Sequence, residues 1–172
     1  MKAKTSSQAR SIAMGNPAAN PGAQAVAEPS ATDFARIYRS APIERIMMIR
    51  QGVPAGAVLH LAKIMGRPKD RLFTVLGLPR ATIDRKARAA QRLSVEQGER
   101  VIGCSKLVGQ VQVMVEQSGE PVGFDAARWL ADWLDTPLPA LDGKCPADYL
   151  DTVEGQEFVS SLLAKMQSGA YL

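Results

Sequence analysis

The sequence predicts an all-α protein, in which an N-terminal helix-turn-helix bundle is followed by a small helical domain. Apolar residues recur at the three- and four-residue spacing of one helix face through most of the chain after residue 40. Glycine and proline interrupt these stretches at the short intervals typical of helix ends. No segment forms a convincing strand. Residues 107–115 are rich in β-branched side chains, but their seven-residue periodicity favours a helix.

Length and composition narrow the class of protein. A chain of 172 residues, 46% of them hydrophobic, is long enough for one ordinary domain or two small ones. No apolar run approaches the roughly 20 residues of a membrane-spanning helix, and the first residues lack the apolar core of a secretory signal. The two cysteines, Cys104 and Cys145, lack the spacing of a zinc site or a disulfide framework. We therefore expect a cytoplasmic protein without cofactor, metal, membrane contact or small-molecule substrate.

Charge is distributed unevenly along the chain, although the net charge is only +4. Residues 36–106 contain fifteen Lys or Arg against five Asp or Glu, a net charge of +10. Residues 107–172 contain three against ten, a net charge of −7. A basic middle and an acidic end suggest two different partners.

Composition and charge also define the expected domains. Residues 1–34 are expected to be a flexible arm, because residues 1–32 are rich in Ala, Pro, Ser, Gly and Asn and show no sustained apolar period. Residues 35–106 then form the basic helix-turn-helix domain, and residues 107–172 form the acidic helical domain.

Four short helices are predicted in the basic domain, each bounded by glycine or proline: residues 43–51, 54–65, 68–76 and 79–90. The last of them is expected to turn Ile83, Ala87 and Ala90 inward.

A long helix is predicted next, with the spacing of a capping box in Ser94 and Gln97 at its start. One face of this helix carries a valine-rich apolar stripe, formed by Val101, Cys104, Val108, Val111 and Val115. This face is a candidate dimer surface, although covering the helix-turn-helix core is the role we favour. Beyond the break at SGEPVGF, one helix carries Trp129 and Trp133. The last helix carries Phe158, Val159, Leu162, Leu163 and Met166 on one face and is ended by Gly169.

Residues 69–92 have the layout of a helix-turn-helix, with two short helices joined by a tight turn at Gly77. Five residues of the second helix are expected to contact phosphates and base edges in a major groove of DNA: Arg80, Thr82, Arg85, Lys86 and Arg88. One such module reads few base pairs, so useful affinity requires a homodimer on two half-sites. A solvated basic helix in a small bundle is the alternative.

Catalysis is not expected from this sequence. A thiol nucleophile at Cys145 would need a base, and His60 is the only histidine. His60 falls outside the apolar stripe of its helix in the basic domain, and nothing in the sequence places it beside Cys145. No metal-binding cluster, phosphate-binding glycine loop or Ser/His/Asp set appears elsewhere. We therefore predict that the protein is not an enzyme.

The segment TPLPALDGKCPADYLDTVEGQEFV, residues 136–159, predicts a rigid surface instead. Three prolines reduce the entropy lost on ordering it, and the Asp142-Gly143 pair suits a turn with positive φ. Leu141, Tyr149 and Leu150 then either anchor the turn to the tryptophans or face another protein.

This region resembles the C-terminal toxin-binding domain of the Xre/MbcA/ParS antitoxin family, over about the last 50 residues. The family usually carries a helix-turn-helix domain where residues 40–105 lie. One departure is Leu138, where the family often has Asn, and it puts a local turn or hydrogen bond in doubt. The matching positions are Trp129-Leu130, Thr136-Pro137, Ala140-Leu141, Gly143, Pro146, Leu150, Thr152, Gly155, Val159 and Gly169.

The resemblance implies the antitoxin of a type II toxin–antitoxin system. Its partner would be a RES-domain toxin, encoded next to it, that degrades NAD. The C-terminal domain would obstruct the toxin's active site, and the N-terminal domain would bind the operon promoter as an autorepressor. The implied toxin contacts are Leu141, Gly143, Pro146, Tyr149, Lys165, Tyr171 and Leu172. The alternative is a stand-alone helix-turn-helix regulator whose acidic domain serves oligomerisation or sensing.

Overall fold

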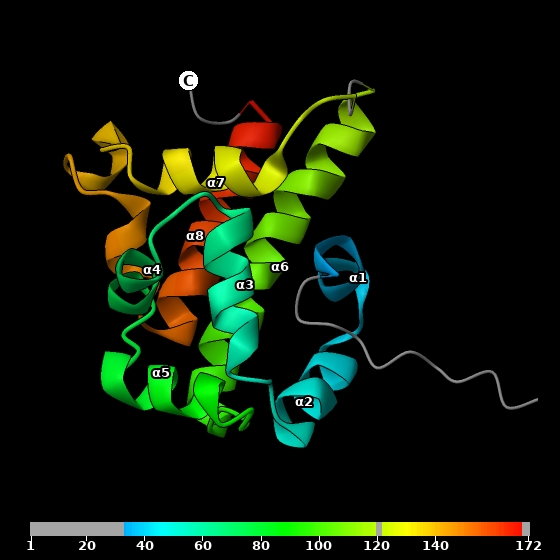
Figure 1. Cartoon of the computed structure of the whole chain (residues 1–172). Helices are drawn as coiled ribbons and strands as arrows, with labels where there is room; N and C mark the ends of the chain where they lie inside the picture. Colours follow the sequence, from blue (N-terminus) through cyan, green and yellow to red (C-terminus); the bar gives the residue numbers. More distant parts are fainter. Residues whose placement is uncertain (1–32, 120–121, 170–172) are drawn as a thin grey trace, which may run out of the picture.

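The computed structural model describes residues 33–119 and 122–169, and these residues are built from helices without any strand (Figure 1). The all-α prediction is therefore confirmed. In chain order the helices are α1 (Phe34–Arg39), α2 (Pro42–Gln51), α3 (Gly56–Ile64), α4 (Lys69–Val75), α5 (Arg80–Arg88), α6 (Val95–Ser118), α7 (Ala126–Leu134), the 3-10 helices η1 (Pro139–Leu141) and η2 (Pro146–Tyr149), and α8 (Val153–Gln167).

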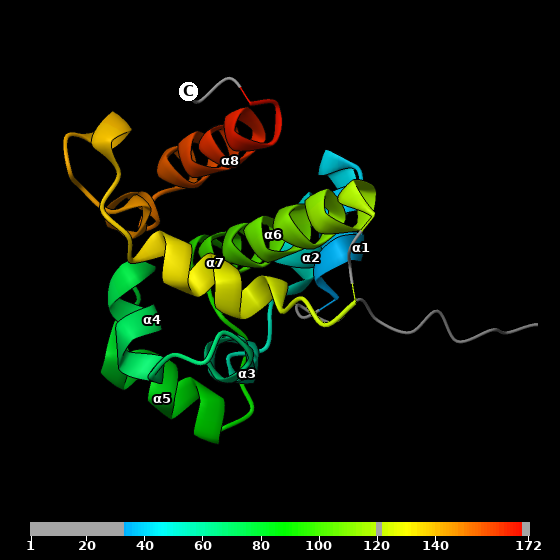
Figure 2. The same cartoon turned by 90° about the horizontal axis from the view of Figure 1, so that it is seen from above.

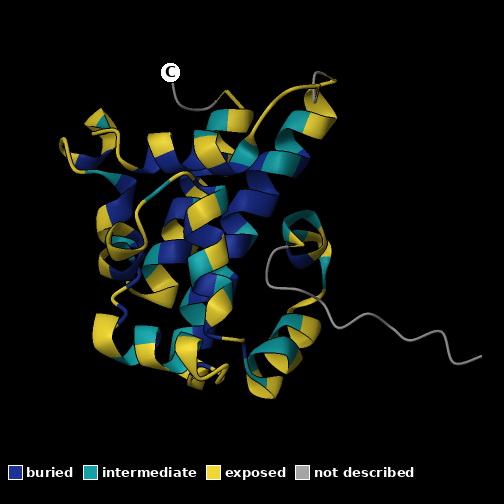
Figure 3. Ribbon diagram, viewed as in Figure 1, coloured by how far each residue is buried: buried dark blue, intermediate teal, exposed yellow. Residues whose placement is uncertain are grey.

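The long helix α6 is the central element of the fold. Its N-terminus carries the predicted capping box, in which Ser94 Oγ accepts from the Gln97 backbone N–H and the Gln97 side chain accepts from the Ser94 N–H. Figure 2 shows α8 on one side of α6, with α3, α4 and α5 on the other. Buried residues follow α6 over most of its length (Figure 3). The helix thus separates two faces of the molecule while supporting both.

The valine-rich stripe of α6 covers the core, as the favoured interpretation predicted. Val101, Val108 and Val111 are each at most 2% exposed. This face is therefore not available as a dimer surface. The predicted domain boundary between residues 106 and 107 falls inside α6, and one hydrophobic cluster extends from α1 to α8.

Two glycines of α6 allow close approach of its neighbours. A Cβ on Gly109 would overlap the carbonyl of Phe34 at the start of α1, and a Cβ on Gly103 would overlap the Gln156 side chain of α8. These positions explain how α1 and α8 both lie close against one helix.

The helix-turn-helix forms as predicted from α4 and α5. Gly77 in the turn has φ of +58°, a backbone conformation that favours glycine. Phe73 of α4 and Ile83 of α5 are completely buried, so the two helices are held by apolar contact.

Three local details differ from the expectations. Ala90 does not face inward, because α5 ends at Arg88 and Ala90 is exposed with φ of +50°. Phe158 lies outside the buried stripe of α8 and is 40% exposed. Helix α1 begins at Phe34, inside the expected arm, whose residues 1–32 lie outside the described part of the chain.

Within the described ranges, none of the helices combines the length and the apolar character that crossing a membrane requires.

Candidate DNA- and toxin-binding surfaces

Helix α5 presents the predicted DNA-contacting residues on its outer side. Ile83 is the only buried residue of this helix, so the remaining side chains lie at or near the surface. Arg80, Arg85 and Arg88 are exposed, whereas Thr82 and Lys86 are half-buried. The helix therefore displays cationic side chains along its length, as DNA binding requires.

Two of the five residues are tied to neighbouring helices. Arg80 Nη2 lies 3.2 Å from Thr74 Oγ1, and its Nε lies 4.0 Å from Asp70 Oδ1. Lys86 Nζ donates to Gln97 Oε1 at 3.2 Å. In the described part of the chain, Arg85 and Arg88 form no ion pair. These two arginines are therefore exposed without an ion-pair partner among the described residues, as contact with a phosphate backbone requires.

Some basic residues of the segment 36–106 form ion pairs within the molecule. Arg67 Nη2 lies 2.6 Å from Asp132 Oδ1 of α7, and Arg67 Nε lies 3.2 Å from Asp135 Oδ2. Arg71 pairs with the other carboxylate oxygen of Asp135 at 2.5 Å. The hydrogen bond with Asp132 is the main cause of the raised pKa of Arg67.

The opposite charges of the two halves therefore partly neutralise each other. Lys106 of α6 and Glu157 of α8 add a further pair at 2.7 Å. Part of the charge asymmetry of the sequence is therefore used for internal pairing, and only the remainder is available for partners. Sequence position could not separate the two uses, because the paired residues Arg67 and Asp132 are 65 positions apart.

The loop between α7 and α8 is held by its own backbone. Asp142 and Gly143 both have positive φ, at +53° and +78°, as the turn prediction required. Leu138 donates to the Lys144 carbonyl at 3.0 Å, and the Gly143 N–H donates to the Leu138 carbonyl at 3.0 Å. Thus Leu138 closes the turn through its backbone without the side-chain amide that the family often has there.

The predicted toxin contacts are divided between core and surface. Leu141 and Pro146 are buried, so they support the loop from within. Gly143 and Lys165 are exposed, and Tyr149 is half-buried. Tyr171 and Leu172 lie outside the described residues.

A surface patch on α8 was not predicted. Phe158 packs edge-to-face on Tyr149 with ring centroids 5.4 Å apart, and Val153 on the first turn is 50% exposed. Exposed carboxylates lie near these residues in sequence: Asp148, Asp151, Glu154 and Glu157. We call Tyr149 and Phe158 the α8 patch. Phe158 is adjacent to the buried Val159, at the edge of the apolar stripe, which is why periodicity alone placed it inside.

Two buried amides fix α8 on α6. Gln156 is 4% exposed, and its Nε2 donates to the carbonyls of Arg100 and Leu150 at 3.0 and 2.9 Å. Gln110 Nε2 donates to the Ser160 carbonyl at 2.9 Å, and the Ser160 hydroxyl donates back to Gln110 Oε1 at 2.7 Å. Because buried polar groups require partners, these bonds select one position of α8.

Neither cysteine is placed for nucleophilic chemistry. Complete burial raises the pKa of the Cys104 thiol to about 12. Cys145 donates its S–H to the Asp135 carbonyl at 3.4 Å, and its backbone N–H donates to Asp148 Oδ2 at 3.1 Å. His60 is exposed on α3. In the described residues, no three or more His, Cys, Asp or Glu side chains are grouped as a metal site would require.

Fold and surfaces together define a helix-turn-helix protein with a second helical unit, α7 to α8, packed on its longest helix. Comparison with known proteins agrees with this class. The family model of the antitoxin Xre-like helix-turn-helix domain matches residues 44–103, and that of the antitoxin Xre/MbcA/ParS C-terminal toxin-binding domain matches residues 123–169.

A relative that aligns over most of its length shows the same relationship. The chain is 47% identical over 138 residues to the "Prs ADP-ribosylating antitoxin" of Sphingobium sp. (strain YBL2), which covers 80% of this chain and 87% of the relative. The chain therefore belongs to the Xre/MbcA/ParS antitoxin family. It is an antitoxin with a helix-turn-helix domain and a toxin-binding domain, and the prediction that it is not an enzyme is confirmed by this membership.

Proposed function

We propose that this antitoxin belongs to a type II toxin–antitoxin pair and neutralises a RES-domain toxin encoded by the adjacent gene. The toxin would consume NAD, and the C-terminal domain would obstruct the entrance to its active site. The name of the Sphingobium relative refers to ADP-ribosylation, a reaction that uses NAD as its donor. That chemistry supports an NAD-consuming partner.

The observation that carries this proposal is the α8 patch within the toxin-binding domain. Aromatic and aliphatic side chains at the centre of a charged rim are typical of protein interfaces. Phe158 supplies exposed apolar area, and exposed carboxylates close to it in sequence, Asp151 and Glu154, match a cationic surface on the partner. The proposed domain division of 35–106 and 107–172 assigns this patch to the toxin and α5 to DNA.

The N-terminal domain would bind the promoter of the operon and repress it. Arg85 and Arg88 on α5 would contact phosphates or base edges, with Arg80, Thr82 and Lys86 beside them. Two copies of the chain would bind two half-sites, because one recognition helix reads too few base pairs for tight binding.

Co-expression with the adjacent gene tests the proposal. The neighbour should be toxic alone, lower cellular NAD, and become harmless when this chain is present. It should also purify as a complex with this chain. A neighbour that is harmless alone, or that remains toxic without binding this chain, would contradict the proposal. Either result would favour the alternative of a stand-alone helix-turn-helix transcriptional regulator.

A further inference from the structure

An apolar groove lies where the C-terminal parts of α6 and α8 meet the start of α7, and it has a volume of 280 Å³. Trp129 lies between two aromatic neighbours, Phe124 and Trp133, and the ring centroids are 6.2 Å apart in both pairs. We call this feature the α6/α8 groove. Uncharged side chains line it, among them Met114, Val115, Phe124, Trp129, Met166 and Gln167.

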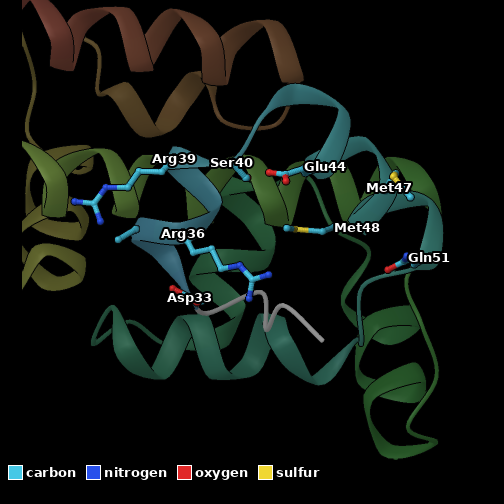
Figure 4. Close-up of a pocket in the computed structure, with 9 residues that line it drawn as sticks. Asp33, Arg36, Arg39, Ser40, Glu44, Met47, Met48 and Gln51 are labelled. Carbon is cyan, nitrogen blue, oxygen red and sulfur yellow. The ribbon is translucent and has the colours of Figure 1, made fainter. Parts of the chain in front are cut away.

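The groove between α1 and α2 is larger, at 580 Å³, and differs in its chemistry (Figure 4). Charged side chains line it, among them Arg36, Arg39 and Glu44. A cover over that groove would remove these charges from water, which costs free energy unless each charge is paired. Apolar area has the opposite preference, because its transfer out of water is favourable. Of the two grooves, the α6/α8 groove is therefore the one that favours an apolar cover.

The described part of the chain ends directly beside the α6/α8 groove. Helix α8 ends at Gln167, and both Met166 and Gln167 line the groove. The Gly169 N–H donates to the Met166 carbonyl at 3.3 Å, and Gly169 has φ of +68°, so the chain turns away from the axis of α8. Residues 170–172 follow directly and lie outside the described residues. Because Tyr171 is two residues after Gly169, its Cα lies within about 7 Å of the Gly169 Cα.

We propose that the side chain of Tyr171 occupies the α6/α8 groove of the same chain. A segment joined to the groove by so few residues has an effective concentration in the millimolar range, so it occupies the groove ahead of a separate molecule at lower concentration. The groove volume of 280 Å³ is below the roughly 300–1,000 Å³ of small-molecule sites and suits one or two side chains.

The lining of the groove suits an aromatic ring. Aromatic and methionine side chains both make favourable contacts with such a ring, and Trp129 and Met166 supply one of each. A buried phenol hydroxyl also requires a hydrogen-bond partner. Gln167 Nε2 donates to Gln117 Oε1 at 3.2 Å, and Gln167 Oε1 can accept from the hydroxyl of Tyr171.

A consequence for toxin binding rests on the proposed function. The family resemblance implies that Tyr171 contacts the toxin, so the toxin and the groove would compete for the same side chain. The groove would then hold Tyr171 out of water in the free antitoxin and release it when the toxin binds. The contact within the free chain does not depend on this consequence and can be measured without the toxin.

Methionine methyl signals in nuclear magnetic resonance spectra of the free full-length chain test the inference. Met114 and Met166 line the groove, whereas Met47 is exposed on α2. In the unmodified chain the Tyr171 ring should show nuclear Overhauser contacts with the ε-methyl groups of Met114 and Met166. Tyr171→Ser should abolish these contacts and shift both methyl signals, because the ring is lost. The Met47 signal should not move.

The matched control variant is Tyr171→Phe, which keeps the ring and should keep the contacts with both methyl groups. Tryptophan fluorescence gives a second readout, since Trp129 and Trp133 are the two tryptophans of the chain. Tyr171→Ser should increase the quenching of their fluorescence by acrylamide, whereas Tyr171→Phe should not. Circular dichroism should show equal helix content in all three proteins, because residue 171 follows the end of α8.

The inference is overturned if the Tyr171 ring contacts neither methyl group, or if Tyr171→Ser leaves both methyl signals in place. Two other occupants of the groove give distinct results. Met114 and Met166 signals that shift with protein concentration would assign the groove to a second copy. Signals that ignore Tyr171→Ser but shift on addition of the adjacent gene's protein would assign it to the toxin. Either result overturns the inference, whereas a chain that binds no toxin would contradict the proposed function and leave the groove contact standing.

Discussion

Helices α5 and α8 carry the two proposed binding surfaces, but the chain holds them in different ways. Helix α5 buries only Ile83 and exposes cationic side chains, of which Arg85 and Arg88 form no ion pair within the described residues. Helix α8 is fixed on α6 by the buried amides of Gln156 and Gln110. Contact with phosphates tolerates mobile charges, whereas an interface that fills another protein's pocket depends on a defined shape. Changes to the buried face of α8 should therefore affect folding and toxin binding together, whereas changes at α5 should affect DNA binding alone.

Replacing the buried amide of α8 is expected to have the largest effect. Gln156→Leu removes two hydrogen bonds and leaves the Leu150 and Arg100 carbonyls without that donor, so the free energy of unfolding should fall by about 2 kcal/mol. The control is Gln167→Leu, since Gln167 also bonds α6 but is exposed, and should cost less than about 0.5 kcal/mol. Urea denaturation measures both. Equal losses would show that α8 is not held by its buried amides.

Shortening an aromatic residue of the α8 patch should separate binding from folding. Phe158→Ala removes the ring that packs on Tyr149 and should weaken toxin binding about 30-fold, the size of an interface hot spot. Ser161→Ala, at an exposed position of the same helix, should leave the affinity unchanged. Isothermal titration calorimetry with the purified toxin measures both variants. Normal affinity in Phe158→Ala would exclude the patch as the docking surface.

An unpaired arginine and a paired arginine of the basic segment should differ in their effect on DNA binding. Arg85→Ala should weaken promoter binding about tenfold and reduce the slope of log affinity against log salt by about 1, because one phosphate contact is lost. Arg71→Ala removes the same charge from the same segment, but Arg71 is paired with Asp135 of α7, so the slope should not change. Fluorescence anisotropy over a salt series measures the slopes. An equal reduction of the slope in both variants would mean that the whole basic segment contacts DNA.

Loss of an exposed ion pair between the halves should have the smallest effect. Asp132→Asn removes one of the two carboxylate partners of Arg67 and should cost about 0.5 kcal/mol at low salt and less at high salt. The pKa of Arg67 is raised, so its contribution is present below its unfolded-state pKa and is lost only as the pH rises through the folded-state pKa. The cost should therefore be the same between about pH 6 and pH 9. Thermal unfolding measures it, and a strong change within that range would show that another group titrates with the pair.

Several features of the fold could be predicted because they depend on neighbours in sequence. The capping box of Ser94 and Gln97, the turn at Gly77 and the turn at Asp142-Gly143 each involve residues within a few positions of one another. Sequence periodicity gave wrong predictions where packing decided the end of a helix or the edge of its buried face. Periodicity continued through Ala90 after α5 had ended, and it could not distinguish Phe158, at the stripe's edge, from the buried Val159.

The sequence by itself determined the all-α class, the helix-turn-helix and the family, since these follow from periodicity, caps and spaced motifs read along the chain. Only the tertiary structure decided which charges are free and which apolar faces are covered. Arg71 and Arg85 look alike in sequence, but one is paired with a carboxylate of α7 and the other is exposed. The valines of α6 and the apolar face of α2 have similar patterns, yet only the valines are buried. The physical reason is that burial and ion pairing depend on residues far apart in the chain, which only folding brings together.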